Sequence, residues 1–248
     1  MATAAGSISG VGGGVIIKPV LDAVSTMSTV TVSFLSAFTV LAMTVTSMLY
    51  SRGGPIKLEK RRGSLLAIGA SLGGIVGKQV FEILHFTNEA TLDIVQQVMM
   101  TLLTSAVFIY TIKRDKIKTK DVKRVFACLI IGLVLGLVSA FLGIGGGPLN
   151  LAVLYFFFGM DSKTAALNSL YIILFSQTAS LIMTFVGNAV PEFSRFVLIA
   201  MCSGGILGGL LGQNISVKLT NRGIDRLFLM ILIVITLISF YNLARCFV

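Results

Sequence analysis

Long uncharged apolar runs alternate with short charged loops along the whole chain. A helix needs about 20 consecutive apolar residues to cross the hydrocarbon core of a bilayer, and several runs reach that length. The pattern predicts six transmembrane helices, at residues 25–51, 63–84, 94–112, 164–191, 196–217 and 227–244. The fold class we expect is therefore an all-α polytopic membrane protein.

Two other apolar segments, 1–24 and 125–160, do not fit this simple scheme. The second is a run of 36 residues without one charged side chain. One crossing takes about 20 residues and two take about 40 plus a turn, so this length fits a helical hairpin that enters the bilayer, breaks at its glycines and leaves on the same side. Broken helices occur at membrane depth only where the freed backbone is buried in protein or lines a cavity. We expect each break to form the floor of a binding site.

The chain repeats two glycine motifs in the same order. The pattern Gly-x-Gly-Gly-Gly spans residues 10–14 and recurs at 143–147, and the pattern Leu-Gly-Gly-x-x-Gly spans 72–77 and recurs at 207–212. Two collinear matches at similar spacing indicate an internal duplication. The first repeat is expected over residues 1–112 and the second over 125–248, with 113–124 as a linker.

Basic residues gather in the loops and set the orientation. Loop 52–62 holds five basic residues against one acidic residue, and linker 113–124 holds seven against two, so both are predicted to be cytoplasmic. If 125–160 is a hairpin, Lys218, Arg222 and Arg226 also stay inside. Each half then consists of a re-entrant helical hairpin plus three transmembrane helices. Because three is odd, the halves run in opposite directions and form an inverted repeat, which is typical of secondary transporters.

Composition supports the membrane class and excludes several others. The chain is 55% hydrophobic and 12% charged, against about 25% charged in soluble domains. Its net charge of +10 lies in short loops between apolar runs, so it reports orientation and predicts membrane lipids, not nucleic acid, as partners. One histidine and three cysteines without paired spacing indicate no metal or other cofactor. The sequence shows no nucleophile–base set, so it does not indicate an enzyme. It also shows no phosphate-binding loop, so it does not indicate ATP-driven transport.

The repeated glycines are the main candidate site. A helix that begins just after each cluster directs free N–H groups and its positive dipole end toward a ligand, which favours a small anion. The alternative is that the glycines only allow tight helix packing. The glycines predicted to bind substrate are Gly12, Gly13, Gly14, Gly145, Gly146 and Gly147.

Polar side chains near these glycines complete the predicted site. Lys18 lies one turn beyond Gly14, and an intramembrane lysine is either functional or snorkels to the interface; we leave both readings open. Ser28, Asn150 and Asn168 are predicted donors to the anion, with interhelical hydrogen bonding as the alternative. Lys78 and Glu82 are one helical turn apart. We expect them to form a structural ion pair; the alternative hypothesis is a relay for an ion or a proton through Glu82.

The segments Gly10 to Pro19 and Gly143 to Pro148 take equivalent places in two halves of four elements each. In this the chain resembles the TauE/SafE sulfite exporter family, also called the toluene-sulfonate uptake permeases. The resemblance covers nearly the whole chain. It implies a transporter in the plasma (inner) membrane of a bacterium or archaeon that moves sulfite, thiosulfate or sulfonates without ATP, and it is compatible with a coupled proton. Substrate, direction and the formation of a homo-oligomer stay open.

Two features depart from the family pattern. Few residues precede the first glycine motif, where family members carry a full apolar helix, and Pro19 follows its glycines by five residues whereas Pro148 follows at once. The two hairpins therefore need not contribute equally. The alternatives to a sulfur-anion transporter are a passive anion channel of the same architecture, a transporter of a non-sulfur organic anion, and an intramembrane enzyme.

Overall fold

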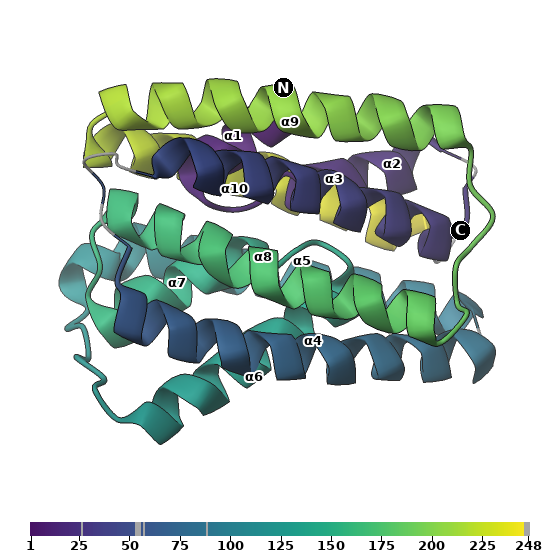
Figure 1. Cartoon of the computed structure of the whole chain (residues 1–248), viewed down its shortest axis with the longest axis horizontal. Helices are drawn as coiled ribbons and strands as arrows, with labels where there is room; N and C mark the ends of the chain where they lie inside the picture. The colour runs from purple at the N-terminus through teal and green to yellow at the C-terminus, as the bar shows by residue number, and fades with distance from the viewer. Residues whose placement is uncertain (26, 53–55, 57, 88, 246–248) are drawn as a thin grey trace.

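The protein is all helical over the residues that the computed structural model describes, 1–25, 27–52, 56, 58–87 and 89–245 (Figure 1). Cys246 lies outside this range. The described elements are α1 (Ala2–Ser9), α2 (Gly14–Val24), α3 (Thr29–Ser51), α4 (Lys60–Thr87), α5 (Glu89–Lys113), the 3₁₀ helix η1 (Arg114–Lys116), α6 (Val125–Leu142), α7 (Gly147–Phe158), α8 (Ser162–Val186), α9 (Arg195–Lys218) and α10 (Asn221–Arg245).

Seven of the described helices are long and apolar enough to cross a membrane, and six of them overlap the six predicted spans. The seventh is α6, the first arm of the predicted hairpin at 125–160. The helix ends differ from the predicted bounds where local chemistry sets them. Span 25–51 begins instead at Thr29, because the hydroxyl oxygen of Ser28 accepts a hydrogen bond from the backbone N–H of Thr31 and caps the helix. Span 164–191 ends at Val186, and Gly187 forms its C-cap.

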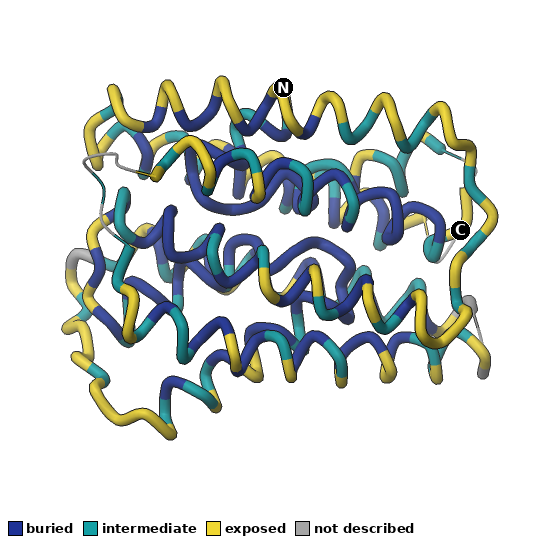
Figure 2. Tube along the Cα trace, in the orientation of Figure 1, coloured by how far each residue is buried: buried dark blue, intermediate teal, exposed yellow. Residues whose placement is uncertain are grey.

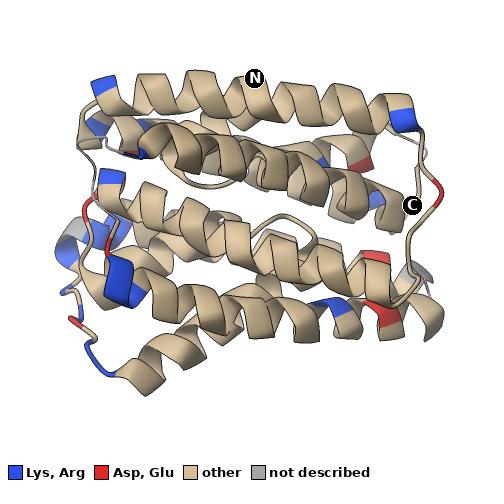
Figure 3. Cartoon of the chain, in the orientation of Figure 1, with Lys and Arg blue, Asp and Glu red and all other residues tan. Residues whose placement is uncertain are grey.

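The long helices run side by side along the longest axis of the molecule (Figure 1). Lys and Arg gather at one end of this bundle (Figure 3). We call it the basic end; α3, α5 and α9 finish there, and α4, α6, α8 and α10 begin there. The opposite end, where α4 and α8 finish, is called the far end.

The second glycine motif of each half packs helices closely together. In α4, a Cβ atom at Gly73 or Gly77 would strike the backbone of α6 at Leu133 or Leu137. In α9, Gly208 and Gly212 meet α1 in the same way, at Thr3, Ala4 and Ser7. Small residues let helix backbones approach each other in a membrane, where apolar burial alone supplies little attraction. Residues 72–77 and 207–212 are thus packing motifs.

The first glycine motif of each half forms a turn inside the bundle. The α1–α2 turn lies at residues 10–13 and the α6–α7 turn at 143–146. Figure 2 shows both turns in dark blue, between the two ends of the molecule, and every residue of both is buried. Because their non-helical backbone lies in the interior, these two turns are the candidate site.

Candidate functional site

The two interior turns need glycine because of their backbone angles. Gly10 ends α1 at φ 74° and Gly143 ends α6 at φ 65°, while Gly12 and Gly145 follow at φ 81° and 78°. Side chains other than glycine rarely adopt these left-handed angles. Both helices therefore stop at the same place in the motif and allow a new helix to start four residues later.

The turns sit in matching surroundings made by α3 and α8. Gly143 lies against Ser33 of α3, and Gly10 lies against Ala166 of α8. Ser33 and Ala166 are separated by 133 residues, the same offset that separates the two glycines. Ser169 donates a hydrogen bond to the carbonyl oxygen of Gly10 at 2.6 Å. Each half of the chain thus supports the glycine turn of the other half.

The N-termini of α2 and α7 meet where the turns meet. A Cβ atom at Gly14 would lie 2.7 Å from the carbonyl oxygen of Ile144, and Gly147 packs against the side chain of Val15. The N-cap residues are Gly13 and Gly146, and neither N-terminus is capped by a side-chain hydrogen bond. The first N–H groups of a helix have no intrahelical acceptor and carry the positive end of its dipole. Two such ends in one buried place can attract an anion.

Buried polar atoms without a hydrogen-bond partner among the described residues gather around the turns. Both side-chain polar atoms of Asn150 are in this state, in the first turns of α7 beside Gly146. So are the hydroxyl groups of Ser33 and Ser36 on α3 and the amide nitrogen of Gln177 on α8. Buried polar atoms are normally paired, so each exception calls for an explanation such as a ligand.

The structure brings together only part of the predicted side-chain set. Asn150 lies at the α7 N-terminus and is fully buried. Asn168 is also buried, but its amide donates to the carbonyl oxygen of Thr164 at 2.8 Å and its side-chain oxygen lies beside Gly63 of α4. Ser28 is exposed at the start of α3, apart from both turns.

Lys18 does not snorkel. It is 3% exposed and forms an ion pair with Asp22 at 3.1 Å, one turn further along α2. Gln97 of α5 donates to the same carboxylate oxygen of Asp22, also at 3.1 Å. The positive charge of Lys18 is thus already matched by a carboxylate whose side chain is 10% exposed. Asp22 was not among the predicted site residues. Its spacing of four residues from Lys18 is the signal that could have identified it.

A second lysine, Lys78 of α4, lies next to the α6–α7 turn. It forms the predicted pair with Glu82, at 3.6 Å, and its ammonium nitrogen lies 4.5 Å from the centre of the Phe81 ring. Lys78 and Phe81 line two adjoining cavities. The inner chamber, about 20 Å³, borders Gly143 and is lined also by Ser33, Phe34, Ala37, Ala140, Gln177, Ser180, Leu181 and Thr184. The vestibule, about 370 Å³, lies between the start of α3, the far end of α4 and loop residues 188–192.

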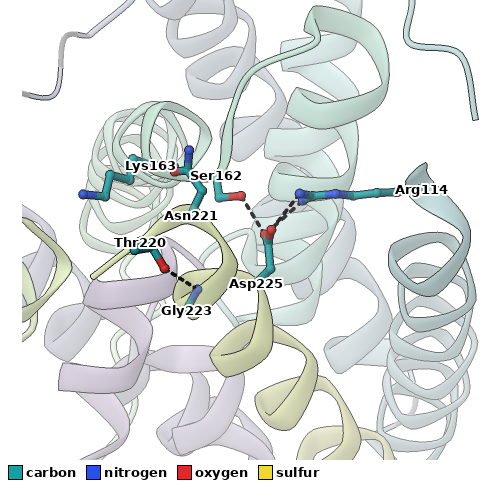
Figure 4. A network of polar contacts seen from close by, with 7 residues as sticks. All are labelled: Arg114, Ser162, Lys163, Thr220, Asn221, Gly223 and Asp225. Carbon is teal, nitrogen blue, oxygen red and sulfur yellow. Dashed lines mark hydrogen bonds and ion pairs between the residues drawn. The ribbon is translucent and has the colours of Figure 1, made fainter. Parts of the chain in front are cut away.

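The basic end is held together by polar contacts across several helices (Figure 4). Arg114 makes two hydrogen bonds to Asp225 of α10, at 3.0 and 2.7 Å, and Ser162 of α8 donates to the same carboxylate at 2.6 Å. The guanidinium of Arg114 also lies 4.5 Å from the centre of the Tyr155 ring in α7. Burial lowers the pKa of Arg114, but the carboxylate of Asp225 opposes this, so the pKa is raised overall. Arg114 therefore stays charged and joins three helices.

The sequence of the chain is similar to those of two proteins described as probable membrane transporters. The chain is 23% identical over 257 residues to "Probable membrane transporter protein YunE" of Bacillus subtilis (strain 168), which covers 93% of this chain and 90% of that protein. It is 38% identical over 88 residues to "Probable membrane transporter protein y4hK" of Sinorhizobium fredii (strain NBRC 101917 / NGR234), where the match covers 35% of this chain and 36% of the relative. No solved structure matches the chain.

The family assignment rests on a match to nearly the whole chain. A family model described as "Sulfite exporter TauE/SafE" matches residues 1–238, including both glycine turns and the seven candidate spans up to residue 238. The protein is an integral membrane transporter and not an enzyme, and it belongs to the TauE/SafE sulfite exporter family.

Proposed function

We propose that the protein is a secondary transporter of a small sulfur-containing anion, such as sulfite, thiosulfate or a sulfonate, across the plasma membrane of a bacterium or archaeon. The anion is held between the N-termini of α2 and α7. The observation that carries this proposal is the meeting of two buried helix N-termini whose N-cap residues, Gly13 and Gly146, provide no side-chain cap. The description of the matched family supports the choice of a sulfur-containing anion.

In this proposal the N–H groups that follow Gly13 and Gly146 bind the anion directly. Asn150 adds a side-chain donor, because its amide nitrogen is buried without a partner among the described residues. We keep Lys18, Ser28 and Asn168 as weaker candidates, since each is engaged elsewhere. A small anion suits a site of this kind because backbone glycines let a ligand approach the main chain closely.

We further propose that the two halves form an inverted repeat with re-entrant hairpins. The contacts of the linker support this for α6–α7. The backbone N–H groups of Lys120 and Val122 donate to the carbonyl oxygens of Phe156 and Phe157, at 2.7 and 3.0 Å, so α7 ends beside the linker that precedes α6. Two helix pairs also join the halves in a corresponding way: α4 of the first half packs on α6 of the second, and α9 of the second half packs on α1 of the first.

The topology can be tested with single cysteines in a background where Cys128, Cys202 and Cys246 are replaced by serine. Lys118 precedes α6 and Asp161 follows α7, and both are exposed. If α6–α7 is re-entrant, cysteines at these two positions react with an impermeant maleimide only from the cytoplasmic side. A cysteine at Glu192, in the exposed loop between α8 and α9, should react only from outside. Labelling of positions 118 and 161 from opposite sides would exclude the hairpin.

The function is tested by binding and flux with the purified protein. The thermal unfolding temperature is measured with sulfite, thiosulfate, sulfate, sulfoacetate, taurine, acetate and chloride at matched ionic strength. A ligand at 100 times its Kd stabilises the folded state by about 2.7 kcal/mol, which this measurement resolves. We expect a shift for sulfur oxyanions or sulfonates and none for acetate or chloride.

Flux into proteoliposomes separates a transporter from a channel. Saturable uptake that is accelerated by unlabelled anion inside the vesicle, known as counterflow, requires alternating access. Linear flux without counterflow would instead identify a passive anion channel. A coupled proton is part of the proposal, so an imposed pH gradient should drive uptake of the anion that shifts the unfolding temperature. Binding of carboxylates alone would remove the support for a sulfur-containing substrate.

A further inference from the structure

Lys78 occupies the junction between the vestibule and the inner chamber. Its side chain is 11% exposed and lines both cavities together with Phe81. The inner chamber borders Gly143, the residue that ends α6 at the second glycine turn. A path from the far end of the bundle to the glycine turn thus passes Lys78.

The charge around the inner chamber favours an anion. Of the described residues that line the chamber, Lys78 is the only charged one. A similar cavity of about 10 Å³ lies beside Lys18, on the other side of the same turn at Leu142 and Ile144, but there Asp22 lines the cavity as well. Glu82, the partner of Lys78, lines the vestibule and not the inner chamber. Among the described lining residues, the inner chamber therefore presents only the ammonium of its pair, whereas the cavity at Lys18 contains both members of its pair.

Hydrogen-bond donors extend from Lys78 toward the glycine turn. The amide nitrogen of Gln177 is buried, with Gln177 1% exposed, and has no partner among the described residues. The hydroxyl of Ser33, next to Gly143, is in the same state. An ammonium group with nearby amide and hydroxyl donors matches the acceptor-only oxygens of an oxyanion.

The inner chamber and the vestibule differ in volume, and only the vestibule can hold the anion. A cavity of about 10–15 Å³ is just enough for one water molecule, so the inner chamber, at about 20 Å³, is too small for a sulfur oxyanion in this conformation. The vestibule, at about 370 Å³, has ample room. An anion that reaches Lys78 from the far end therefore stops at the floor of the vestibule until the helices around the chamber move.

We propose that Lys78 is a substrate-binding residue at this floor, and that it holds a small sulfur oxyanion before the anion passes to the glycine turn. Glu82 is then an internal competitor: it pairs with the ammonium of Lys78 at 3.6 Å, and the arriving anion takes its place. The inference rests on the proposed function, because it concerns the route to the same glycine site.

The opposite effects of Lys78 and Glu82 make the test specific. Binding of thiosulfate and sulfite to the purified full chain is measured by calorimetry at constant ionic strength. For Lys78→Gln we expect binding about tenfold weaker or more, since a hydrogen bond from a charged donor is lost. Lys78→Arg keeps the charge and should retain most of the affinity. Glu82→Gln removes the competitor and should tighten binding by about threefold or more.

Arg195→Gln serves as the matched control. Arg195 is exposed, begins α9 just after the loop residues that line the vestibule, and carries the same charge as Lys78. Arg195→Gln removes one positive charge, as Lys78→Gln does, but the charge of exposed Arg195 is screened by salt, so binding should stay within about twofold of the wild type. Equal losses in Arg195→Gln and Lys78→Gln would reduce Lys78 to a source of general attraction and overturn the inference.

The outcomes separate this inference from the proposed function. If the wild type binds the probes and Lys78→Gln binds them equally, or if Lys78→Gln and Glu82→Gln both weaken binding, then Lys78 and Glu82 form only a structural pair and the proposed function stands. If the wild type binds neither probe nor any other anion of the panel, both proposals fall. Weaker binding in Lys78→Gln with tighter binding in Glu82→Gln is the result we expect.

Discussion

Two helices of this transporter contain a lysine paired with a carboxylate four residues later, and the two pairs differ in their surroundings. Lys18 and Asp22 are 3.1 Å apart, with side chains 4% and 10% exposed, and Gln97 adds a hydrogen bond to the carboxylate. Lys78 and Glu82 are 3.6 Å apart, with side chains 11% and 21% exposed. Lys78 also lines a chamber that contains no second charge among its described lining residues.

The comparison shows that a lysine in a membrane helix is not functional merely because it is there. We expect the more deeply buried Lys18 to contribute mainly to folding, and Lys78, whose carboxylate partner lies outside the inner chamber, to exchange that partner for a ligand. The sequence favoured Lys18, which follows the glycine motif directly, and treated Lys78 as half of a structural pair. The structure confirms the Lys78–Glu82 pair. The two cavities beside it are the reason why we propose that Lys78 binds substrate.

The largest expected effect concerns the Lys18–Asp22 pair. Lys18→Met should lower the free energy of unfolding by about 3 kcal/mol or more, because it leaves a buried carboxylate without its counter-charge. The double variant Lys18→Met/Asp22→Asn should recover most of this loss, since no unpaired charge remains. Lys78→Met should cost less, because the side chain of Glu82 is 21% exposed, against 10% for Asp22.

Unfolding temperatures of the three variants and the parent protein in one detergent check this prediction. Calorimetry with thiosulfate on the same samples sharpens it. If the double variant Lys18→Met/Asp22→Asn is stable but has lost anion binding, Lys18 contributes to substrate binding after all, and the contrast between the two pairs fails.

A smaller effect is expected at the basic end, where Arg114 and Asp225 are joined by two hydrogen bonds but keep partial contact with solvent, at 25% and 21% exposure. Asp225→Asn should lower the free energy of unfolding by about 1–2 kcal/mol, because it removes a charge-assisted pair and weakens the bond from Ser162. The pair also holds α8 and α10 to η1, so its loss should favour opening of the basic end.

The readout for Asp225→Asn is the reaction of a cysteine placed at Lys163, beside the network (Figure 4), with an impermeant maleimide from the cytoplasmic side. We expect a faster reaction than in the parent protein. The matched control is Asp121→Asn, which breaks the exposed pairs of Asp121 with Arg62 and Lys123. An equal acceleration in the control would mean that Arg114–Asp225 does not close this end.

Much of the architecture followed from patterns along the chain. Each of the six predicted spans overlaps a long helix, although 25–51 and 164–191 extend beyond theirs, and the break inside 125–160 lies at the glycines that end α6. The equivalence of Gly10 with Gly143 also appears in their surroundings, because Ala166 and Ser33 take matching places beside them. The polar neighbours of the turns, Ser33, Ser36 and Gln177, were missed. The repeat could have pointed to the serines of α3. Ser36 lies 133 residues before Ser169, the same offset as between Gly10 and Gly143, and Ser169 donates a hydrogen bond to Gly10.

The sequence by itself determined the membrane class, the broken helices and the end of the molecule that carries positive charge. These properties depend on runs of apolar residues, on glycines that readily adopt left-handed backbone, and on charges that are costly to place in lipid. Only the tertiary structure decided which polar groups meet across helices and how deeply they are buried, because these contacts join residues distant in the chain. Lys18 is neutralised by Asp22 and bordered by Gln97 of α5, whereas Lys78 faces Gln177 of α8 across a cavity.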